Sequence, residues 1–370
     1  MNTHMDTEKR DNKIKLVDIL KSVVNSMLFP LISIIIAMLV AVFFVMWAKH
    51  TGFIEGAQVL FKAIWNGSFG KKDSTIETFV YVTPLLFTGL ANAVAFKTGL
   101  FNIGVEGQFM MGVLAGTVVG MMTGIPHIIH ILILLIAGMA AGMIWGGIPG
   151  YMKAKKGTNE VVNTIMMNYI ALYFSNYIVM GPLNKKGLAQ TYDIQPSAML
   201  WRFLGSENRL NTGFFIGILF VILIYIFFWK TTWGYEIRAV GLNSDAAEYG
   251  GINIKKNIIL AMVISGGIAG IGGAVYVSGI QYHTIQLTGF TGYGMDGIAV
   301  ALLAKSHPIG ILFSALLFGA LNTSSISLQM SNIPKQIVFL IQSIIIIFVA
   351  ADYVYKWIIE KRKKEANING

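Results

Sequence analysis

The sequence predicts an all-α, polytopic membrane protein with about ten membrane-spanning helices. Composition is the first reason, because 55% of the 370 residues are hydrophobic and only 12% are charged. A soluble domain needs about 25% charged residues to cover its surface. The mean hydropathy is +0.65. Apolar stretches of about 20 residues recur along the chain, and this is the length of one helix that crosses a bilayer.

Ten apolar stretches are expected to cross the membrane. The first is too long for the core of a signal peptide and no cleavage pattern follows it, so we expect it to remain in the protein. The eighth and ninth are short, and each opens with a glycine-rich or proline-containing stretch, which is typical of broken or re-entrant helices. The expected spans are 27–47, 76–96, 100–122, 128–149, 160–181, 212–230, 257–279, 291–304, 308–323 and 335–355.

The distribution of basic residues predicts the orientation. With the amino end in the cytoplasm, 19 of the 28 Lys and Arg residues fall on the cytoplasmic side, as the positive-inside rule requires. We therefore expect a cytoplasmic segment 1–26, a transmembrane domain 27–355 and a cytoplasmic basic tail 356–370.

Several kinds of site are excluded by what the sequence lacks. It has no cysteine, no GxxxxGK[ST] phosphate loop and no His cluster with metal-ligand spacing, so we expect no cofactor, metal or catalytic site. The net charge of +10 lies in short loops between apolar runs, which favours membrane flanks over nucleic acid. No nucleophile and base are clustered, which argues against a membrane-embedded enzyme.

Two long segments are expected outside the membrane. Residues 48–75 are expected to form an amphipathic helix on the membrane surface. Residues 183–211 are mixed and polar. Either segment could receive an extracellular partner, or it could be an interfacial lid with none.

Small residues recur at helical spacing and predict close helix packing. Gly112, Gly116, Gly120 and Gly124 follow one another at every fourth residue, as do Gly138, Gly142, Gly146 and Gly150, and 265–273 is similarly glycine-rich.

A weak internal echo links 101–108 (FNIGVEGQ) with 290–297 (FTGYGMDG). Each places an aromatic residue and glycines before an acid that is followed by glycine. The expected topology puts the first near the inner face and the second near the outer face, as an inverted repeat would.

The longest cytoplasmic loop, 231–257, is polar and punctuated by glycine. Asn243 or Ser244 is expected to cap a short helix that ends at Gly250 and Gly251. Such a helix could be gripped by a motor subunit, or the loop could be a solvated connector.

Five stretches resemble permeases of binding-protein-dependent ABC importers, in the superfamily that carries ribose and branched-chain amino acids. The stretch 234–252 (GYEIRAVGLNSDAAEYGGI) is similar to their coupling loop. Stretches 83–91 (TPLLFTGLA), 99–108 (GLFNIGVEGQ), 158–170 (TNEVVNTIMMNYI) and 294–304 (GMDGIAVALLA) resemble the nucleoside branch, in which basic-membrane-protein-type lipoproteins deliver the substrate. The resemblance covers about 80–350, and the extended amino end is similar to the larger of two paired permeases.

The resemblance implies a cytoplasmic ABC ATPase, a second permease, an extracellular substrate-binding lipoprotein and a bacterial cytoplasmic membrane. It also implies that the ATPase contacts the coupling loop. The residues expected there are Glu236, Arg238, Gly241, Asn243, Asp245, Ala246, Ala247, Tyr249 and Gly250.

Polar and aromatic residues inside the spans are candidates for a substrate pathway, because polar groups in hydrocarbon usually face a bundle interior or a cavity. Amides and carboxylates suit sugar hydroxyls, and aromatic rings suit a flat base. The candidates are Asn92, Phe101, Asn102, Glu106, Gln108, Asn163, Asn168, Tyr169, Phe290, Tyr293 and Asp296.

Structural roles are alternatives for many of these residues. Glu106 and Asp296 could stabilise the amino ends of their helices, and Asn163 and Asn168 could form interhelical hydrogen bonds. Glu160 could pair with Lys156. His307-Pro308 could serve a proton relay, although proline at a helix start explains the break alone.

The function expected from the sequence is therefore the permease subunit of a bacterial ATP-driven importer of nucleosides, with ATP hydrolysis in a separate subunit. One alternative is a permease for a simple sugar such as ribose. Another is an ion-coupled secondary transporter driven through Glu106 or Asp296, which would not need a capped helix in the cytoplasmic loop.

Overall fold

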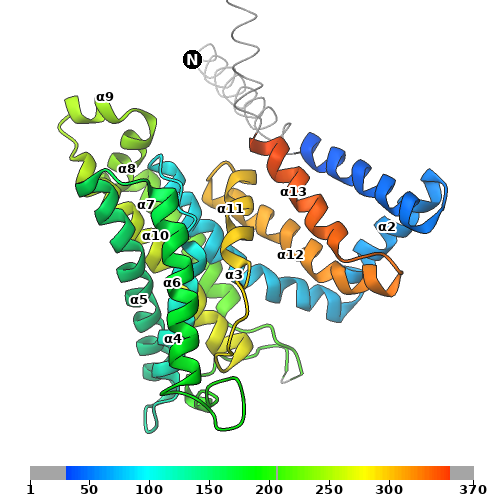
Figure 1. Cartoon of the computed structure of the whole chain (residues 1–370), viewed down its shortest axis with the longest axis horizontal. Helices are drawn as coiled ribbons and strands as arrows, with labels where there is room; N and C mark the ends of the chain where they lie inside the picture. Colours follow the sequence, from blue (N-terminus) through cyan, green and yellow to red (C-terminus); the bar gives the residue numbers. More distant parts are fainter. Residues whose placement is uncertain (1–30, 206, 351–370) are drawn as a thin grey trace, which may run out of the picture. The chain divides into compact units, whose positions relative to one another are not determined.

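The computed structural model describes residues 31–205 and 207–350 (Figure 1). These residues form helices joined by loops, and strand pairing among them is limited to isolated bridges. The all-α prediction is confirmed. Residues 1–30 and 351–370, which include the expected cytoplasmic ends, lie outside the described residues.

The chain forms two compact units, Lys62–Met330 and a second made of the two ends of the chain. The described part of the second unit contains the helix Leu31–Lys49 and α13 (Gln336–Ala350). Helix α2 (Phe53–Ser68) contains the boundary at residue 61. In α2, Leu60 and Ala63 are buried, whereas the apolar residues Ile54 and Trp65 are exposed. A helix forms here as expected, and its position on the membrane surface stays a prediction.

The described residues of the larger unit contain ten α-helices in addition to the end of α2. They are α3 (Lys72–Lys97), α4 (Val105–Gly120), α5 (His127–Lys156), α6 (Glu160–Met180), α7 (Gly213–Lys230), α8 (Thr232–Leu242), α9 (Ser244–Tyr249), α10 (Ile254–Tyr276), α11 (Tyr293–Leu303) and α12 (Pro308–Met330), of which α9 is a short six-residue helix. A π-helix, Val277–Gln281, continues α10, and a 3-10 turn, Pro196–Ala198, lies in the 183–211 segment.

Every expected span coincides with a helix, but the helices differ in how well they could cross a bilayer alone. Among the described residues, six helices are long and apolar enough, and three shorter apolar helices accompany them. Helix α6 is long enough but carries three asparagines and is less apolar than these six. The chain is a multi-pass membrane protein.

The two helices expected to be short turn out differently. Helix α11 has 11 residues, which is about half the length needed to cross the hydrocarbon core. The prediction that this span is short is therefore confirmed. Helix α12 has 23 residues, so the prediction of a short ninth span was wrong. Polar Asn322, Thr323 and Ser324 interrupt its apolar pattern and made it look shorter.

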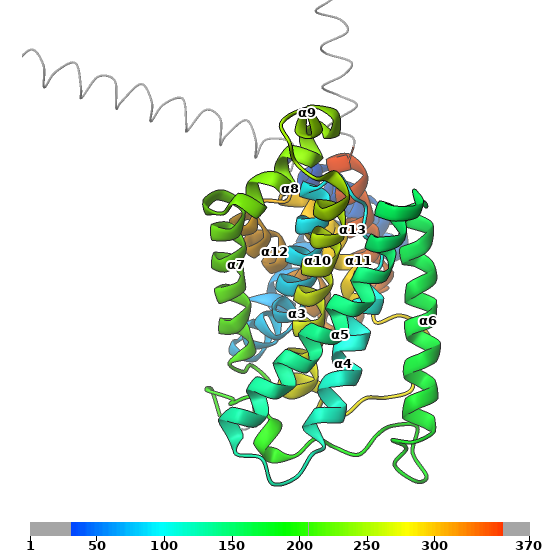
Figure 2. The same ribbon diagram turned by 90° about the vertical axis from the view of Figure 1, so that its left-hand side faces the viewer.

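Helices α3 and α10 form the centre of the larger unit. Their most apolar windows are 83% and 72% buried, against 22% for α5. Helix α10 packs against α3, α4 and α5 (Figure 2). Buried small residues along α10 let the backbones of its neighbours approach closely. This matters because lipid supplies no hydrophobic drive for helices to associate.

The glycine spacing does produce close helix contacts. A Cβ atom on Gly142 would collide with the backbone carbonyl of Gly266, and one on Gly112 would collide with that of Gly270. Gly124 is the exception, because it lies outside a helix with φ of +80° and open space around it. The packing prediction is therefore confirmed for the helical glycines and wrong for Gly124.

The 183–211 segment is held by backbone hydrogen bonds despite its lack of long helices. Thr191 and Ile194 donate to the carbonyls of Thr284 and Tyr282, and Leu200 donates to that of Ser278. The segment is thereby tied to the end of α10 and the residues that follow it.

We expect Gly142→Leu to lower the free energy of unfolding by about 1–3 kcal/mol, because the added side chain forces α5 away from α10. Thermal unfolding in detergent measures this effect. The control is Gly289→Ala, where nothing lies within 4 Å of the added atom. Equal unfolding temperatures for Gly142→Leu and the unaltered chain would contradict the close contact.

Candidate functional site

The amino ends of α4 and α11 meet around one buried carboxylate. Glu106 is fully buried. Its Oε1 accepts hydrogen bonds from Thr291 Oγ1 at 2.6 Å and the Gly292 N–H at 2.8 Å, and its Oε2 accepts one from the Gly294 N–H at 2.6 Å. These N–H groups open α11 and have no partner within the helix, so Glu106 caps the neighbouring helix.

This junction corrects one expectation and refines another. The two echo segments were expected at opposite membrane faces, but Glu106 and Gly294 are hydrogen-bonded to each other. The opposite-face prediction was wrong because α11 starts inside the bundle instead of at a membrane surface. Glu106 does stabilise a helix amino end, as expected. It stabilises the amino end of α11 in addition to that of its own helix, α4.

The close approach depends on glycine at the start of α11. A Cβ atom on Gly294 would collide with the backbone of Glu106, and one on Gly297 would lie 2.6 Å from Thr88 Oγ1. Helix α11 is therefore held against α4 on one side and α3 on the other. This explains why glycines flank the acid in the 290–297 stretch.

A closed amide network lies beside this junction. Asn102 Nδ2 donates to Gln108 Oε1 at 3.1 Å and to Ser265 Oγ at 2.9 Å, and Ser265 donates to the Ala91 carbonyl at 2.7 Å. Asn168 Nδ2 donates to the Ile103 carbonyl, and its Oδ1 accepts from the Gly107 N–H. Asn102, Gln108 and Asn168 are all buried. Their amides join α4 to α6 and α10.

Two further polar candidates lie along α3 and α11. Asn92 is fully buried and donates to the Thr88 carbonyl at 2.9 Å and the Gly294 carbonyl at 3.4 Å, while its Oδ1 has no partner among the described residues. Asp296 is partly buried and accepts from Asn322 Nδ2 at 2.9 Å. Both residues tie α11 to a neighbouring helix.

The aromatic candidates do not form one group. Phe101 stacks on Phe96 with ring centroids 5.1 Å apart, whereas Tyr169 meets Phe290 edge-to-face at 5.1 Å. Tyr293 belongs to a third group with Phe109 and Tyr276, at 5.6 and 5.3 Å. Tyr169, on α6, is 44% exposed and is the most exposed of the four candidate rings.

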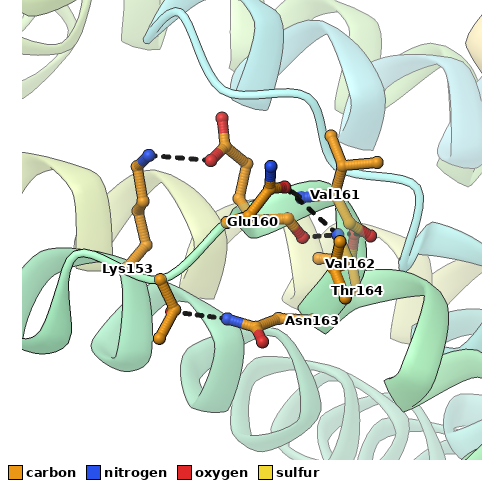
Figure 3. A network of polar contacts seen from close by, with 8 residues as sticks. Lys153, Glu160, Val161, Val162, Asn163 and Thr164 are labelled. Atoms are coloured by element: carbon orange, nitrogen blue, oxygen red, sulfur yellow. Dashed lines mark hydrogen bonds and ion pairs between the residues drawn. The ribbon is translucent and has the colours of Figure 1, made fainter.

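The start of α6 is anchored by a local network (Figure 3). Lys153 forms an ion pair with Glu160 at 2.8 Å, so the expected pairing with Lys156 was wrong. Lys153 lies one helical turn before Gly157, whose N–H donates to the Lys153 carbonyl. Asn163 donates to Thr158 Oγ1 at 2.6 Å, a contact within the turn.

The 231–257 loop contains two helices. Asn243 accepts from the Ala246 N–H at 3.0 Å and caps Ser244–Tyr249, as expected. The sequence prediction missed α8, which Thr231 caps through the Gly234 N–H. Thr231 before a run of helix formers was the available signal.

Of the expected coupling residues, Ala247 is buried, Glu236 and Arg238 are partly buried, and the others are exposed. Glu236 accepts from Asn257 Nδ2 at 2.9 Å, Gly241 lies against the Lys97 backbone, and Ala247 is buried. Asp245, Ala246, Tyr249 and Gly250 are exposed. Leu242 is 89% exposed and Tyr249 is 96% exposed, so α8 and α9 present apolar surface. Of these two residues, only Tyr249 was expected from the sequence to take part in coupling.

Arg238 and His307 both lie against the ring of Trp229, near the end of α7. The Arg238 guanidinium lies 5.6 Å from the centre of the Trp229 ring, and the His307 ring lies 5.0 Å from that ring. The Arg238 Nε is buried without a hydrogen-bond partner among the described residues. Burial lowers the pKa of His307, and the positive charge of Lys97 adds to the shift. His307 is therefore neutral at pH 7.

The sequence of this chain matches one family along most of its length. Residues 74–350 match the family of the permease component of branched-chain amino acid transport systems. The chain belongs to this family. It is therefore the permease component of a transport system.

Curated relatives cover nearly the whole chain. The guanosine ABC transporter permease protein NupP of Bacillus subtilis is 39% identical over 346 residues, which are 92% of this chain and 98% of NupP. The nucleoside ABC transporter permease protein NupB of Lactococcus lactis is 38% identical, with 84% of this chain and 91% of NupB covered.

A more distant relative is named for another substrate. The glucose ABC transporter permease protein TsgB13 of Haloferax volcanii is 27% identical over 315 residues, which are 82% of each chain. No solved structure matches this chain.

We expect Glu106→Gln to lower the free energy of unfolding by about 1–3 kcal/mol, because an amide NH₂ cannot accept from the donors at the start of α11. Thermal unfolding in detergent is the measurement. Glu248→Gln is the control, since Glu248 is exposed. If both variants unfold at the temperature of the unaltered chain, the carboxylate does not hold α11.

We expect the protein to lose stability as the pH falls below about 6.5, the ordinary pKa of histidine. The folded state resists protonation of His307 because its pKa is lowered, whereas the unfolded chain takes up the proton. His307→Gln should therefore lose less thermal stability between pH 7.5 and 5.5 than the unaltered chain. The exposed His50→Gln variant should behave as the unaltered chain. Identical losses in all three proteins would contradict the assignment.

Proposed function

We propose that this chain is the membrane-spanning permease subunit of an ATP-driven importer of nucleosides. The observation that carries this proposal is its similarity, over nearly the full length, to two permeases named for guanosine and nucleosides. The glucose permease is 27% identical, compared with 39% and 38% for these two.

The proposed pathway runs past α4, α6 and α11. Tyr169, Phe290, Tyr293 and Asp296 are partly accessible and are proposed to meet the substrate. The buried members of the set hold the helices that carry them. The proposed pathway residues are those expected from the sequence, namely Asn92, Phe101, Asn102, Glu106, Gln108, Asn163, Asn168, Tyr169, Phe290, Tyr293 and Asp296.

The proposed coupling segment is α8 with α9. Exposed Leu242, Ala246 and Tyr249 give an ATPase subunit an apolar contact surface. The contacts of α8 with its neighbours transmit its movement, because Gly241 packs on the end of α3 and Glu236 is hydrogen-bonded to α10. ATP hydrolysis is assigned to this separate subunit.

The remaining assignments complete the proposed assembly. A second permease lies beside this one in a bacterial cytoplasmic membrane, and an extracellular lipoprotein delivers nucleoside on the side of the 183–211 segment. The segments 1–26 and 356–370 are placed in the cytoplasm, with 27–355 as the transmembrane domain. The supporting observation is the distribution of Lys and Arg.

A simple sugar is the second candidate substrate, because the TsgB13 name specifies glucose. An ion-coupled secondary transporter is disfavoured by membership of a family of transport-system permease components.

Uptake by the assembled transporter tests the substrate class. We expect proteoliposomes with the permeases, ATPase and binding protein of the same organism to take up labelled guanosine when ATP is inside. Excess unlabelled nucleoside should compete, whereas ribose, glucose and leucine should not. Uptake of a sugar without uptake of any nucleoside would contradict the proposal.

A substitution on α9 tests the coupling surface. We expect Ala246→Glu to reduce uptake at least about tenfold, because a charge placed in an apolar protein contact is costly to desolvate. Co-purification of the ATPase and uptake are both measured. The control is Ala189→Glu, at an exposed site in the 183–211 segment. Normal uptake by Ala246→Glu would exclude α9 from the contact.

A further inference from the structure

Two positively charged side chains lie near each other beside the end of α7. Lys97 is the last residue of α3, and Arg238 lies on α8, which follows α7 directly. Both side chains are partly buried, and the charge of Arg238 acts on Lys97. Within residues 31–205 and 207–350, neither of them forms an ion pair with a carboxylate. Like charges that are partly withdrawn from water and uncompensated are unfavourable, so an anion at this position would be stabilising.

The guanidinium of Arg238 has hydrogen-bonding capacity that the described protein does not use. Its Nε is buried without a partner, and none of its other N–H groups donates to a described residue. A buried donor left unpaired is costly. Two oxygens of one oxyanion, placed beside Nε and a terminal nitrogen, would accept two parallel hydrogen bonds in the fork geometry that arginine offers. The geometry therefore suits a phosphate or a carboxylate.

The surroundings of Arg238 are typical of a membrane–water interface. The guanidinium lies over the Trp229 ring, which stacks on Tyr225 with ring centroids 4.9 Å apart and meets the His307 ring at 5.0 Å. Both aromatic residues belong to the last turns of α7, one of the six helices long and apolar enough to cross a membrane. Tryptophan and tyrosine at the end of such a helix lie at the level of the lipid headgroups.

An exposed apolar surface continues from this point along two helices that pack together, α7 and α12. On α7, Ile222 and Ile226 are exposed within two turns of Trp229. On α12, Ile309 and Phe313 are exposed in the first turns after His307. A charged end and an apolar length thus adjoin each other, which is the pattern that a phospholipid presents in reverse.

Two other anions fit this pattern less well. A free phosphate has no part that would cover the apolar surface of α7 and α12. A carboxylate of the proposed ATPase subunit would have to reach a partly buried guanidinium that lies over a ring of α7, whereas Leu242, Ala246 and Tyr249 are exposed. A soluble partner is expected to meet these exposed residues and not Arg238.

We propose that the phosphate of an anionic phospholipid binds between the end of α7, α8 and the start of α12, with Arg238 and Lys97 as its protein ligands. Its acyl chains lie along the exposed apolar residues of α7 and α12. This inference goes beyond the proposed function and does not depend on which substrate is carried. It gives Arg238 a contact with lipid, so that α8 is held at the membrane surface while α9 stays available to the ATPase.

Lipid selectivity of the assembled transporter provides the first test. Native mass spectrometry from micelles with equal amounts of phosphatidylglycerol and phosphatidylcholine counts the bound lipids of each class. We expect Arg238→Gln and Lys97→Gln each to lower the ratio of bound phosphatidylglycerol to phosphatidylcholine about fivefold, because each removes one charge from the phosphate. The matched control is Lys255→Gln, which removes an exposed charge at the start of α10. Arg238→Lys keeps the charge and serves if the glutamine variant does not assemble; its loss should be smaller.

The outcomes distinguish the possible anions. Phosphatidylglycerol should stay bound in excess inorganic phosphate, because its acyl chains add contact. Its displacement by inorganic phosphate would mean that the site takes a free anion, and the lipid assignment would be wrong. A preference that is present in the permease pair and disappears when the ATPase is added would assign Arg238 to an ATPase carboxylate. Equal ratios for Arg238→Gln, Arg238→Lys, Lys255→Gln and the unaltered chain would overturn the site.

Fluorescence quenching provides a second test, which locates the lipid. The chain has no cysteine, so Ile309→Cys gives it a single thiol for a fluorescent label beside the proposed site. We expect phosphatidylglycerol with brominated acyl chains to quench this label at about fivefold lower mole fraction than brominated phosphatidylcholine, and Arg238→Gln should remove the difference. The control is a label at Leu219→Cys, an exposed position ten residues before Trp229 and so about 15 Å away along α7. Equal quenching of the label at position 309 by the two lipids would exclude an anionic lipid from this end of α7.

Discussion

The arrangement of the larger unit depends on the hydrogen bonds between Glu106 and the start of α11. An 11-residue helix that begins inside the bundle exposes N–H groups that neither lipid nor water can satisfy there. One carboxylate accepts from two of these groups and from Thr291. Without such an acceptor, a half-length helix at this depth would leave buried donors unpaired. The acid on α4 therefore makes the broken helix possible.

The glycine contacts complement this junction. Gly142 and Gly266 bring the α5 and α10 backbones together, and Gly294 does the same for α11 and α4. Contacts of this kind leave little freedom for sliding, so α3, α4, α5 and α10 form a rigid frame. Helix α11 is attached to that frame by hydrogen bonds of one side chain. Movement during transport is therefore more readily accommodated at α11 than between α5 and α10.

Apolar length and glycine spacing predicted the fold class and nearly every helix, because each depends on residues close together in the sequence. The Asn243 cap was predictable for the same reason. The hydrogen bond between Glu106 and Gly294 could not be predicted, because 188 positions separate the two residues. The sequence suggested only Lys156 as a partner for Glu160, and Lys153 takes that place one helical turn before the Gly157 cap.

Helices α4 and α10 form close glycine contacts and also line a small cavity next to Phe109 and Tyr276, with different residues in the two roles. On α10, Ser265 and the glycines face α3 and α5, whereas Tyr276 faces the cavity at the end of the helix. On α4, Gln108 belongs to the amide network and its neighbour Phe109 lines the cavity. Residues of the cavity can therefore change without loosening the glycine contacts. The relatives named for nucleosides and for glucose are compatible with such a separation, because the glycine contacts can be kept while other side chains differ.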